Sequence, residues 1–153
     1  MNRNEFKSLL LEVIQNQDNP FHPLVWINGT PDIGADVYIG GFSEINAKGA
    51  QVRIGAGCDI ASFVAINVAD SHLQCIGLAD ANICRDILIG DHVFIGSHCA
   101  ILGGSVIGHH SVIGAGTVVR GISIPPFSLV IGTEVKAGFY RLPYEQRHGA
   151  QPE

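Results

Sequence analysis

The residues best suited to chemistry gather in one stretch, between Ala69 and Arg85. His72 follows Asp70 by two positions, and an imidazole can move protons near pH 7 because histidine changes charge close to that pH. The alternative is a solvated loop histidine. Cys75 and Cys84 could join His72 as zinc ligands, but the spacing matches no structural zinc pattern and no fourth ligand is evident. We therefore expect no metal.

The segment that must position these residues is a repeat with a period of six. Ile33, Ile39 and Ile45 are six positions apart, and the spacing returns in two later series. A helix needs apolar spacings of three and four, and a hairpin strand needs alternation by two, so neither explains the pattern. The later series are Ile54, Ile60 and Ile66, then Ile83, Ile89, Ile95, Ile101, Ile107, Ile113 and Val119. Four places after the isoleucine stands a mostly small residue, as at Ser43, Cys58, Cys99, Ser105, Ser111 and Thr117.

Each hexad is interpreted as a short strand and a corner, with one large and one small side chain turned inward. Three hexads would make one coil, and stacked coils would form parallel sheets with strands about 4.8 Å apart. The sequence therefore predicts an all-β fold, a parallel β-helix of about five coils in which each coil is stabilised by its neighbours.

The period is broken twice. Three residues are added between Ile45 and Ile54, and 17 positions separate Ile66 from Ile83. The second break predicts a loop near 70–82 that projects from the solenoid. Loops on a rigid scaffold often carry function, and this one contains the candidate histidine.

The segment before the repeats, residues 1–32, is expected to form a helix and a cap. Asn4 can cap a helix over 5–16, whose apolar residues make one stripe. That helix could dock on the first coil or on a partner chain.

The repeats are expected to occupy 33–136. Six positions after Val119, Pro125 stands where the isoleucine is expected, and the period of six resumes at Ile131. Residues 137–153 are expected to form a C-terminal extension, with a short helix within 137–147.

Composition limits the classes of function. The 153 residues carry nine Lys and Arg against fourteen Asp and Glu, a formal net charge of -5. Without a basic cluster, such a chain cannot neutralise a long run of phosphates, so no nucleic acid partner is expected. No apolar run is long enough to cross a membrane, and we expect a cytoplasmic protein without a membrane span. The four cysteines are expected to be free thiols.

The motifs resemble a known family. The stretch ILIGDHVFIGSHCAILGGSVIGHHSVIGAGTVV at 87–119 is similar to the hexapeptide-repeat acetyltransferases, closest to the sugar and polysaccharide O-acetyltransferases. An Asp-x-His loop at 70–72, followed by Arg-Asp-Ile at 85–87, resembles the capsule and lipopolysaccharide branch. The resemblance implies a left-handed coil, acetyl-CoA as co-substrate, and a homotrimer with active sites at the boundaries between chains.

The resemblance also implies roles for individual residues. His72 matches the general base that takes a proton from the acceptor, and Asp70 could hold the imidazole tautomer or bind sugar hydroxyls. The pantetheine arm of the coenzyme would lie in a groove between two chains, along backbone groups that match Ser97 and Ala115, 18 positions apart. The other coenzyme residues implied are Phe94 in that groove, and Lys136 and Arg120 near the phosphates, with Glu134 standing where the family has proline.

Three other functions remain open at this point. An N-acetyltransferase for a nucleotide-linked amino sugar would use the same base and thioester. A γ-type carbonic anhydrase shares the fold, but it binds zinc through histidines where this chain has Ser97 and Leu102. A non-catalytic scaffold would keep the solenoid alone. The residues favour acetyl transfer to a sugar hydroxyl of lipopolysaccharide, capsule or a related saccharide.

Overall fold

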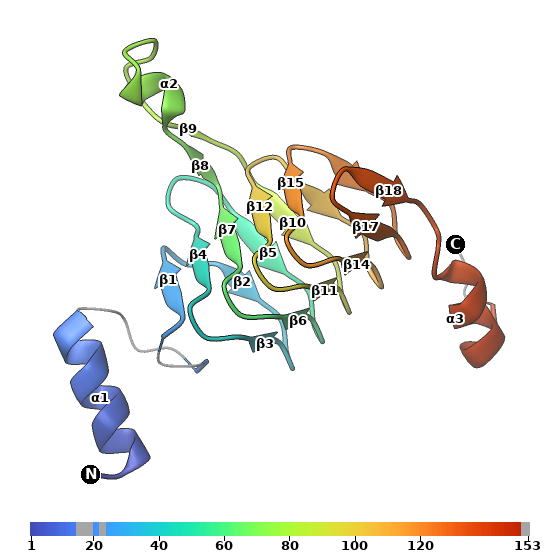
Figure 1. The fold of residues 1–153 in the computed structure, drawn as a ribbon, viewed down its shortest axis with the longest axis horizontal. Coiled ribbons are helices and arrows are strands. Elements are labelled where there is room, and N and C mark those ends of the chain that lie inside the picture. Colours follow the sequence, from blue (N-terminus) through green and yellow to red (C-terminus); the bar gives the residue numbers. More distant parts are fainter. Residues whose placement is uncertain (15–19, 22–23, 151–153) are drawn as a thin grey trace.

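Three parallel sheets form a solenoid with three faces, as the period of six predicts (Figure 1). The computed structural model describes residues 1–14, 20–21 and 24–150. Face A contains β1 (Trp26–Asn28), β4 (Glu44–Asn46), β7 (Ala65–Asn67), β12 (Ala100–Leu102) and β15 (Val118–Arg120). Face B contains β2 (Asp32–Ile33), β5 (Val52–Ile54), β10 (Ile87–Ile89), β13 (Val106–Ile107) and β16 (Ser123–Ile124). Face C contains β3 (Tyr38–Ile39), β6 (Asp59–Ile60), β11 (Phe94–Ile95), β14 (Val112–Ile113), β17 (Leu129–Ile131) and β18 (Glu134–Lys136).

The chain visits faces A, B and C in turn, so each coil has an A–B, a B–C and a C–A corner. The first coil begins at Trp26, inside the segment assigned to the N-terminal cap, because β1 pairs with β4. Five coils result, as expected.

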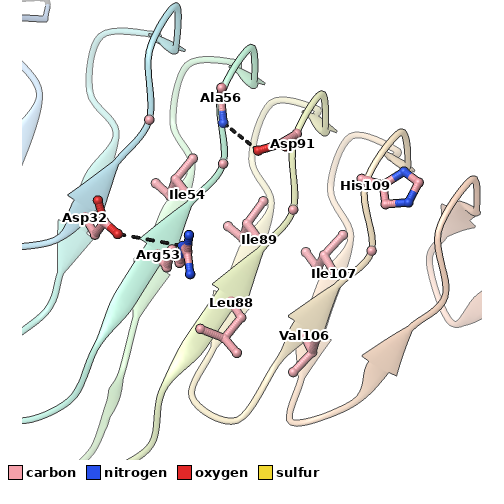
Figure 2. A pocket seen from close by; sticks show the side chains of 14 residues that line it. Asp32, Arg53, Ile54, Ala56, Leu88, Ile89, Asp91, Val106, Ile107 and His109 are labelled. Carbon is pink, nitrogen blue, oxygen red and sulfur yellow. Dashed lines mark hydrogen bonds and ion pairs between the residues drawn. The ribbon is translucent and has the colours of Figure 1, made fainter.

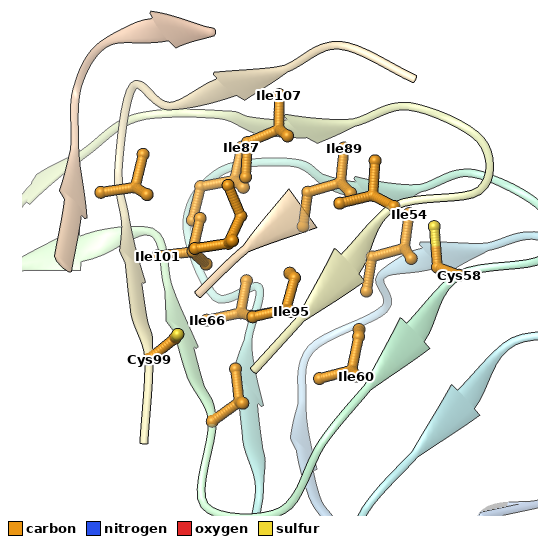
Figure 3. Close-up of a cluster of buried hydrophobic side chains, with 14 of the residues drawn as sticks. Ile54, Cys58, Ile60, Ile66, Ile87, Ile89, Ile95, Cys99, Ile101 and Ile107 are labelled. Atoms are coloured by element: carbon orange, nitrogen blue, oxygen red, sulfur yellow. The ribbon is translucent and has the colours of Figure 1, made fainter. Parts of the chain in front are cut away.

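Identical side chains stack inside the solenoid (Figure 3). Ile95 pairs in register with Ile60 of the coil before and Ile113 of the coil after, and it has no solvent exposure. The predicted small inward residues are buried as well, namely Ser43, Cys58, Cys99, Ser105, Ser111 and Thr117. All four cysteines are free thiols, as predicted. Burial raises the pKa of the Cys58 and Cys99 thiols, which keeps them protonated packing residues.

The register of the fifth coil corrects one prediction. Val130, not Ile131, is the inward residue, since Val130 is 1% exposed and Ile131 is 54% exposed. The reason is a shorter A–B corner: Ile124 pairs with Ile107 in register and follows Val119 after five positions instead of six.

The N-terminal helix α1 (Arg3–Ile14) begins earlier than expected. Asn2, not Asn4, is its cap, because the side-chain oxygen of Asn2 accepts hydrogen bonds from the backbone N–H groups of Asn4 and Glu5, both at 2.9 Å. The end predicted at residue 16 lies outside the described residues. The apolar stripe of α1 is largely exposed to solvent, and the exposed fraction of Val13 is 71%. Among the described residues, every helix is too short or too polar to span a lipid bilayer.

The C-terminal segment covers the end of face C and the adjoining B–C corner. Strand β18 turns back and pairs antiparallel with β17. The predicted helix is α3 (Arg141–His148), and it packs against the B–C corner. There the ring of Tyr144 lies 4.7 Å from that of His110 and 5.1 Å from that of Phe127, measured between centroids.

Candidate active site

The predicted loop is a short hairpin that projects from the A–B corner of the third coil (Figure 1). Strands β8 (Ala69–Asp70) and β9 (Ile83–Cys84) pair antiparallel and form its stem. One turn of helix, α2 (His72–Cys75), follows the first strand. At the base, the Asn67 side-chain oxygen accepts hydrogen bonds from the Ala69 N–H and the Asn46 amide. The hairpin is therefore anchored to two coils.

The stem brings His72 and Asp70 together, as their spacing suggested. The Asp70 Oδ1 atom contacts Nδ1 of His72 and also accepts a hydrogen bond from the His72 backbone N–H at 3.4 Å. The bond to the imidazole holds the pKa of the Asp70 carboxyl below its usual range. An ionised Asp70 favours the tautomer with hydrogen on Nδ1, which leaves the Nε2 lone pair free. The His72 side chain is 59% exposed, so a substrate can reach it.

A pocket of about 140 Å³ opens beside this pair, between the foot of the hairpin and the following coils. Its lining includes Asp70 and two arginines, Arg85 just after β9 and Arg120 at the end of β15. The charge of Arg120 contributes to lowering the pKa of Asp70. The structure thus places Arg120 with the candidate catalytic residues, although the resemblance assigned it to the coenzyme.

The other candidate coenzyme residues lie on another side of the solenoid. Phe94 faces outward from face C, in register with Asp59 and Val112, and is 41% exposed. Ser97 and Ala115 occupy equivalent positions in the C–A corners of the third and fourth coils. Within the described residues, their backbone N–H groups donate no hydrogen bond. Two free N–H groups one coil apart can bind an extended ligand that lies along the solenoid axis.

An aromatic ladder fills the C–A corner in the first three coils. Phe42 stacks on Phe63 with ring centroids 5.1 Å apart, and Phe63 stacks on His98 at 4.9 Å. All three have φ near +60°, a conformation that favours glycine. The equivalent residue in the fourth coil is Gly116, where an added Cβ would meet nothing within 4 Å. The ladder ends there and leaves open space beside the two free N–H groups.

Lys136 lies in β18, the last strand of face C. Its Nζ is 3.7 Å from Oε1 of Glu134 and 5.9 Å from the ring centroid of Phe139. The acid that replaces the family's proline therefore partly neutralises this lysine. Each strand of face A leads from a C–A corner to an A–B corner, so face A separates these residues from His72 within one chain.

Two other candidate sites are less suited to chemistry. In the described ranges, no group of three or more His, Cys, Asp and Glu side chains could hold a metal ion.

A hollow of about 610 Å³ lies on face B (Figure 2), with an apolar floor that includes Leu88. Its carboxylates are already paired, Asp32 with Arg53 at 3.7 Å and Asp91 with the N–H of Ala56 at 2.8 Å.

Part of the repeat region matches a known family model. Residues 86–121 match the family model of the bacterial transferase hexapeptide (six repeats), which implies a left-handed coil. No curated protein sequence matches the chain significantly. The fold is a parallel β-helix, and the hexapeptide repeats matched at 86–121 imply that its coil is left-handed, as the sequence predicted.

Solved structures confirm the resemblance to the hexapeptide-repeat acetyltransferases. The polySia-specific acetyltransferase NeuO is 26% identical at a TM-score of 0.58, and the match covers 73% of this chain and 59% of NeuO. VCA0836 of Vibrio cholerae O1 biovar eltor, solved with acetyl-CoA, is 25% identical at a TM-score of 0.53, with 89% of this chain and 76% of VCA0836 covered.

A third solved structure shares the fold. The N-acyltransferase AntD of Bacillus cereus, solved with dTDP and 3-hydroxybutyryl-CoA, has a TM-score of 0.64 at 16% identity, with 82% of this chain and 72% of AntD covered. At this level of identity the likeness concerns the fold alone.

One site residue was not singled out from the sequence. Arg85 appeared there only as part of the motif that follows the loop. A signal was available, because the residue that closes a hairpin stem must lie near the residues that open it. Here Ala69 opens the stem opposite Cys84, Asp70 comes next after Ala69, and Arg85 directly follows Cys84.

Proposed function

We propose that this protein transfers an acetyl group from acetyl-CoA to a hydroxyl group of a sugar, in a lipopolysaccharide, a capsule or a related saccharide. The hexapeptide-repeat fold and the acetyltransferases among its structural neighbours support the reaction class. The saccharide acceptor is supported by the likeness to NeuO, of which the match covers 59%.

The observation that carries this proposal is the paired side chains of His72 and Asp70 on an anchored hairpin. Asp70 keeps hydrogen on Nδ1, so Nε2 can accept the proton of an acceptor hydroxyl. The hydroxyl oxygen then attacks the thioester carbonyl carbon, the carbon–sulfur bond breaks, and the proton passes from His72 to the departing thiolate. General base catalysis of this kind contributes about 10²- to 10⁴-fold in rate.

Three features of the C–A corner support a coenzyme site there. Free N–H groups of Ser97 and Ala115 would donate hydrogen bonds to the pantetheine amides, and open space at Gly116 admits the arm. Phe94 would flank the arm, and Lys136 lies further along the same side, where the phosphates would reach. Bound acetyl-CoA supplies the activated acyl group as a thioester.

The separation of these two halves supports the homotrimer that the family resemblance implies. His72 and the coenzyme corner lie at opposite ends of the face A strands, so one chain alone does not form the site. In a trimer, the hairpin of one subunit would meet the C–A corner of its neighbour. Analytical ultracentrifugation of the purified protein tests this arrangement, and a purely monomeric, active protein would contradict it.

The experiment that tests the function measures thiol release from acetyl-CoA with free sugars, nucleotide sugars and amino sugars. We expect release with at least one hydroxyl acceptor, and a drop in turnover of about 10²- to 10⁴-fold in His72→Ala with little change in the affinity for acetyl-CoA. His148→Ala, a histidine substitution in α3 that leaves the hairpin intact, is the matched control.

Two results would redirect the proposal. Release with amino sugars alone would favour N-acetylation of an amino sugar. If none of the acceptors gives thiol release, a non-catalytic scaffold is favoured. Full turnover in a folded His72→Ala variant would instead remove His72 as the general base.

A further inference from the structure

The pocket next to Asp70 contains two guanidinium groups, and the charge of one of them, Arg120, acts on the Asp70 carboxylate. Arg85 and Arg120 line the pocket, and among the described residues neither forms an ion pair. The carboxylate within its lining, Asp70, is bonded to His72. Asp86, the neighbour of Arg85 in sequence, is turned to the second coil, where its Oδ1 accepts the Gln51 N–H at 2.8 Å.

The backbone leaves room for Arg85 to lie along the A–B corners. A Cβ added at Gly104 would lie 3.6 Å from Cδ of Arg85, and one added at Gly121 would lie 4.0 Å from its Nη1. Both glycines have positive φ, +87° and +60°. The Arg85 side chain therefore runs from the third coil across the next two corners, toward the strand that ends at Arg120.

We propose that this pocket binds an anionic group of the acceptor, a carboxylate or a phosphate, so that the substrate is an acidic saccharide. The inference rests on the proposed function and specifies its substrate class. A guanidinium binds planar carboxylates and phosphates through paired, charge-assisted hydrogen bonds. In a chain with a net charge of -5, the overall field repels anions, so recognition of an anion requires a local pair of cations such as this one.

The position of the pocket indicates that its ligand is the acceptor and not the coenzyme. It is bordered by Asp70, which holds the imidazole that must touch the reacting hydroxyl. The phosphates of acetyl-CoA are separated from its thioester by the whole pantetheine arm, so they cannot lie beside the reacting atoms. An anion held by Arg85 and Arg120 is therefore a substituent near the hydroxyl that is acetylated.

The test uses matched pairs of sugars that differ in one anionic group. Titration calorimetry would compare hexoses with their uronic acids and 6-phosphates, in the gluco, galacto and manno series. We expect the wild-type protein to bind at least one acidic member about 10- to 100-fold more tightly than its neutral partner. Arg85→Gln and Arg120→Gln should each remove most of that preference. The control is Arg53→Gln, since Arg53 pairs with Asp32 on face B, outside the pocket.

The uronic acid and phosphate arms identify which anion the pocket prefers. Equal affinity for acidic and neutral members in all series, or no binding of any acidic sugar, overturns the inference. An increase in the KM for acetyl-CoA in both arginine variants, with acidic-sugar binding unchanged, assigns the pair to the coenzyme and also overturns it. Arginine-dependent binding of acidic sugars without any thiol release would keep the anion pocket and refute the proposed acetyl transfer alone.

Discussion

Extending the aromatic ladder by one ring should close the coenzyme groove without unfolding the protein. The substitution is Gly116→Phe, which repeats in the fourth coil what Phe63 does in the second. A side chain at positive φ costs about 1 to 2 kcal/mol. Stacking on His98 returns about 0.5 to 1.5 kcal/mol, because aromatic pairs at such distances contribute that much. The free energy of unfolding should therefore change by about 1.5 kcal/mol at most.

Binding should respond much more strongly than stability. A ring at position 116 would cover the space beside the N–H groups of Ser97 and Ala115, and each lost hydrogen bond costs about 1 kcal/mol. Two such losses raise the dissociation constant of acetyl-CoA about 30-fold. Calorimetric titration and thermal unfolding measure both quantities on one sample. Gly116→Ala, which has the same backbone strain but no ring, should bind normally. A folded Gly116→Phe variant with unchanged affinity would refute the location of the groove.

Three further outcomes follow from the structure. Asp70→Asn should lower kcat about 10- to 100-fold at unchanged KM for acetyl-CoA, because an amide can hold the opposite imidazole tautomer; steady-state kinetics would detect a different pattern. Ile95→Ala should lower the free energy of unfolding by about 2 to 5 kcal/mol in urea titrations, since identical residues flank it on both sides, whereas Val118→Ala on the surface should change it little. Burial and neighbouring histidines lower the pKa of His110, so the unfolded chain binds that proton more tightly and stability should fall as the pH drops below 6.5. The melting temperature of wild type should decrease over that range more than that of His110→Phe, and equal slopes would contradict this origin.

The stack of inward-facing side chains could be predicted because two features of the sequence agree. A large residue every six positions and a small one four places later leave one consistent arrangement, and the buried Ile95 and Cys99 confirm it. The fifth coil could not be placed as well, since Ile122, Ile124 and Ile131 are all apolar and allow more than one phase. Only pairing with the fourth coil determines that Ile124 and Val130 point inward.

The candidate site was predictable in parts. The spacing of Asp70 and His72 indicated a dyad, and hairpin pairing supplies the rigidity that spacing cannot show. Ser97 and Ala115 are 18 positions apart, which is one full coil, whereas Arg120 is only five positions beyond Ala115. The period alone thus places Arg120 away from the C–A corner that holds Ser97 and Ala115.

The antiparallel turn of β18 has a consequence for engineering the molecule. A parallel strand edge left bare would offer its hydrogen-bonding groups to the next solenoid, end to end, and invite fibres. Here the last strand folds back on its own predecessor, and α3 lies against the adjoining corner. A longer version would therefore be made by inserting whole coils into the interior, upstream of β17, and keeping this terminus in place.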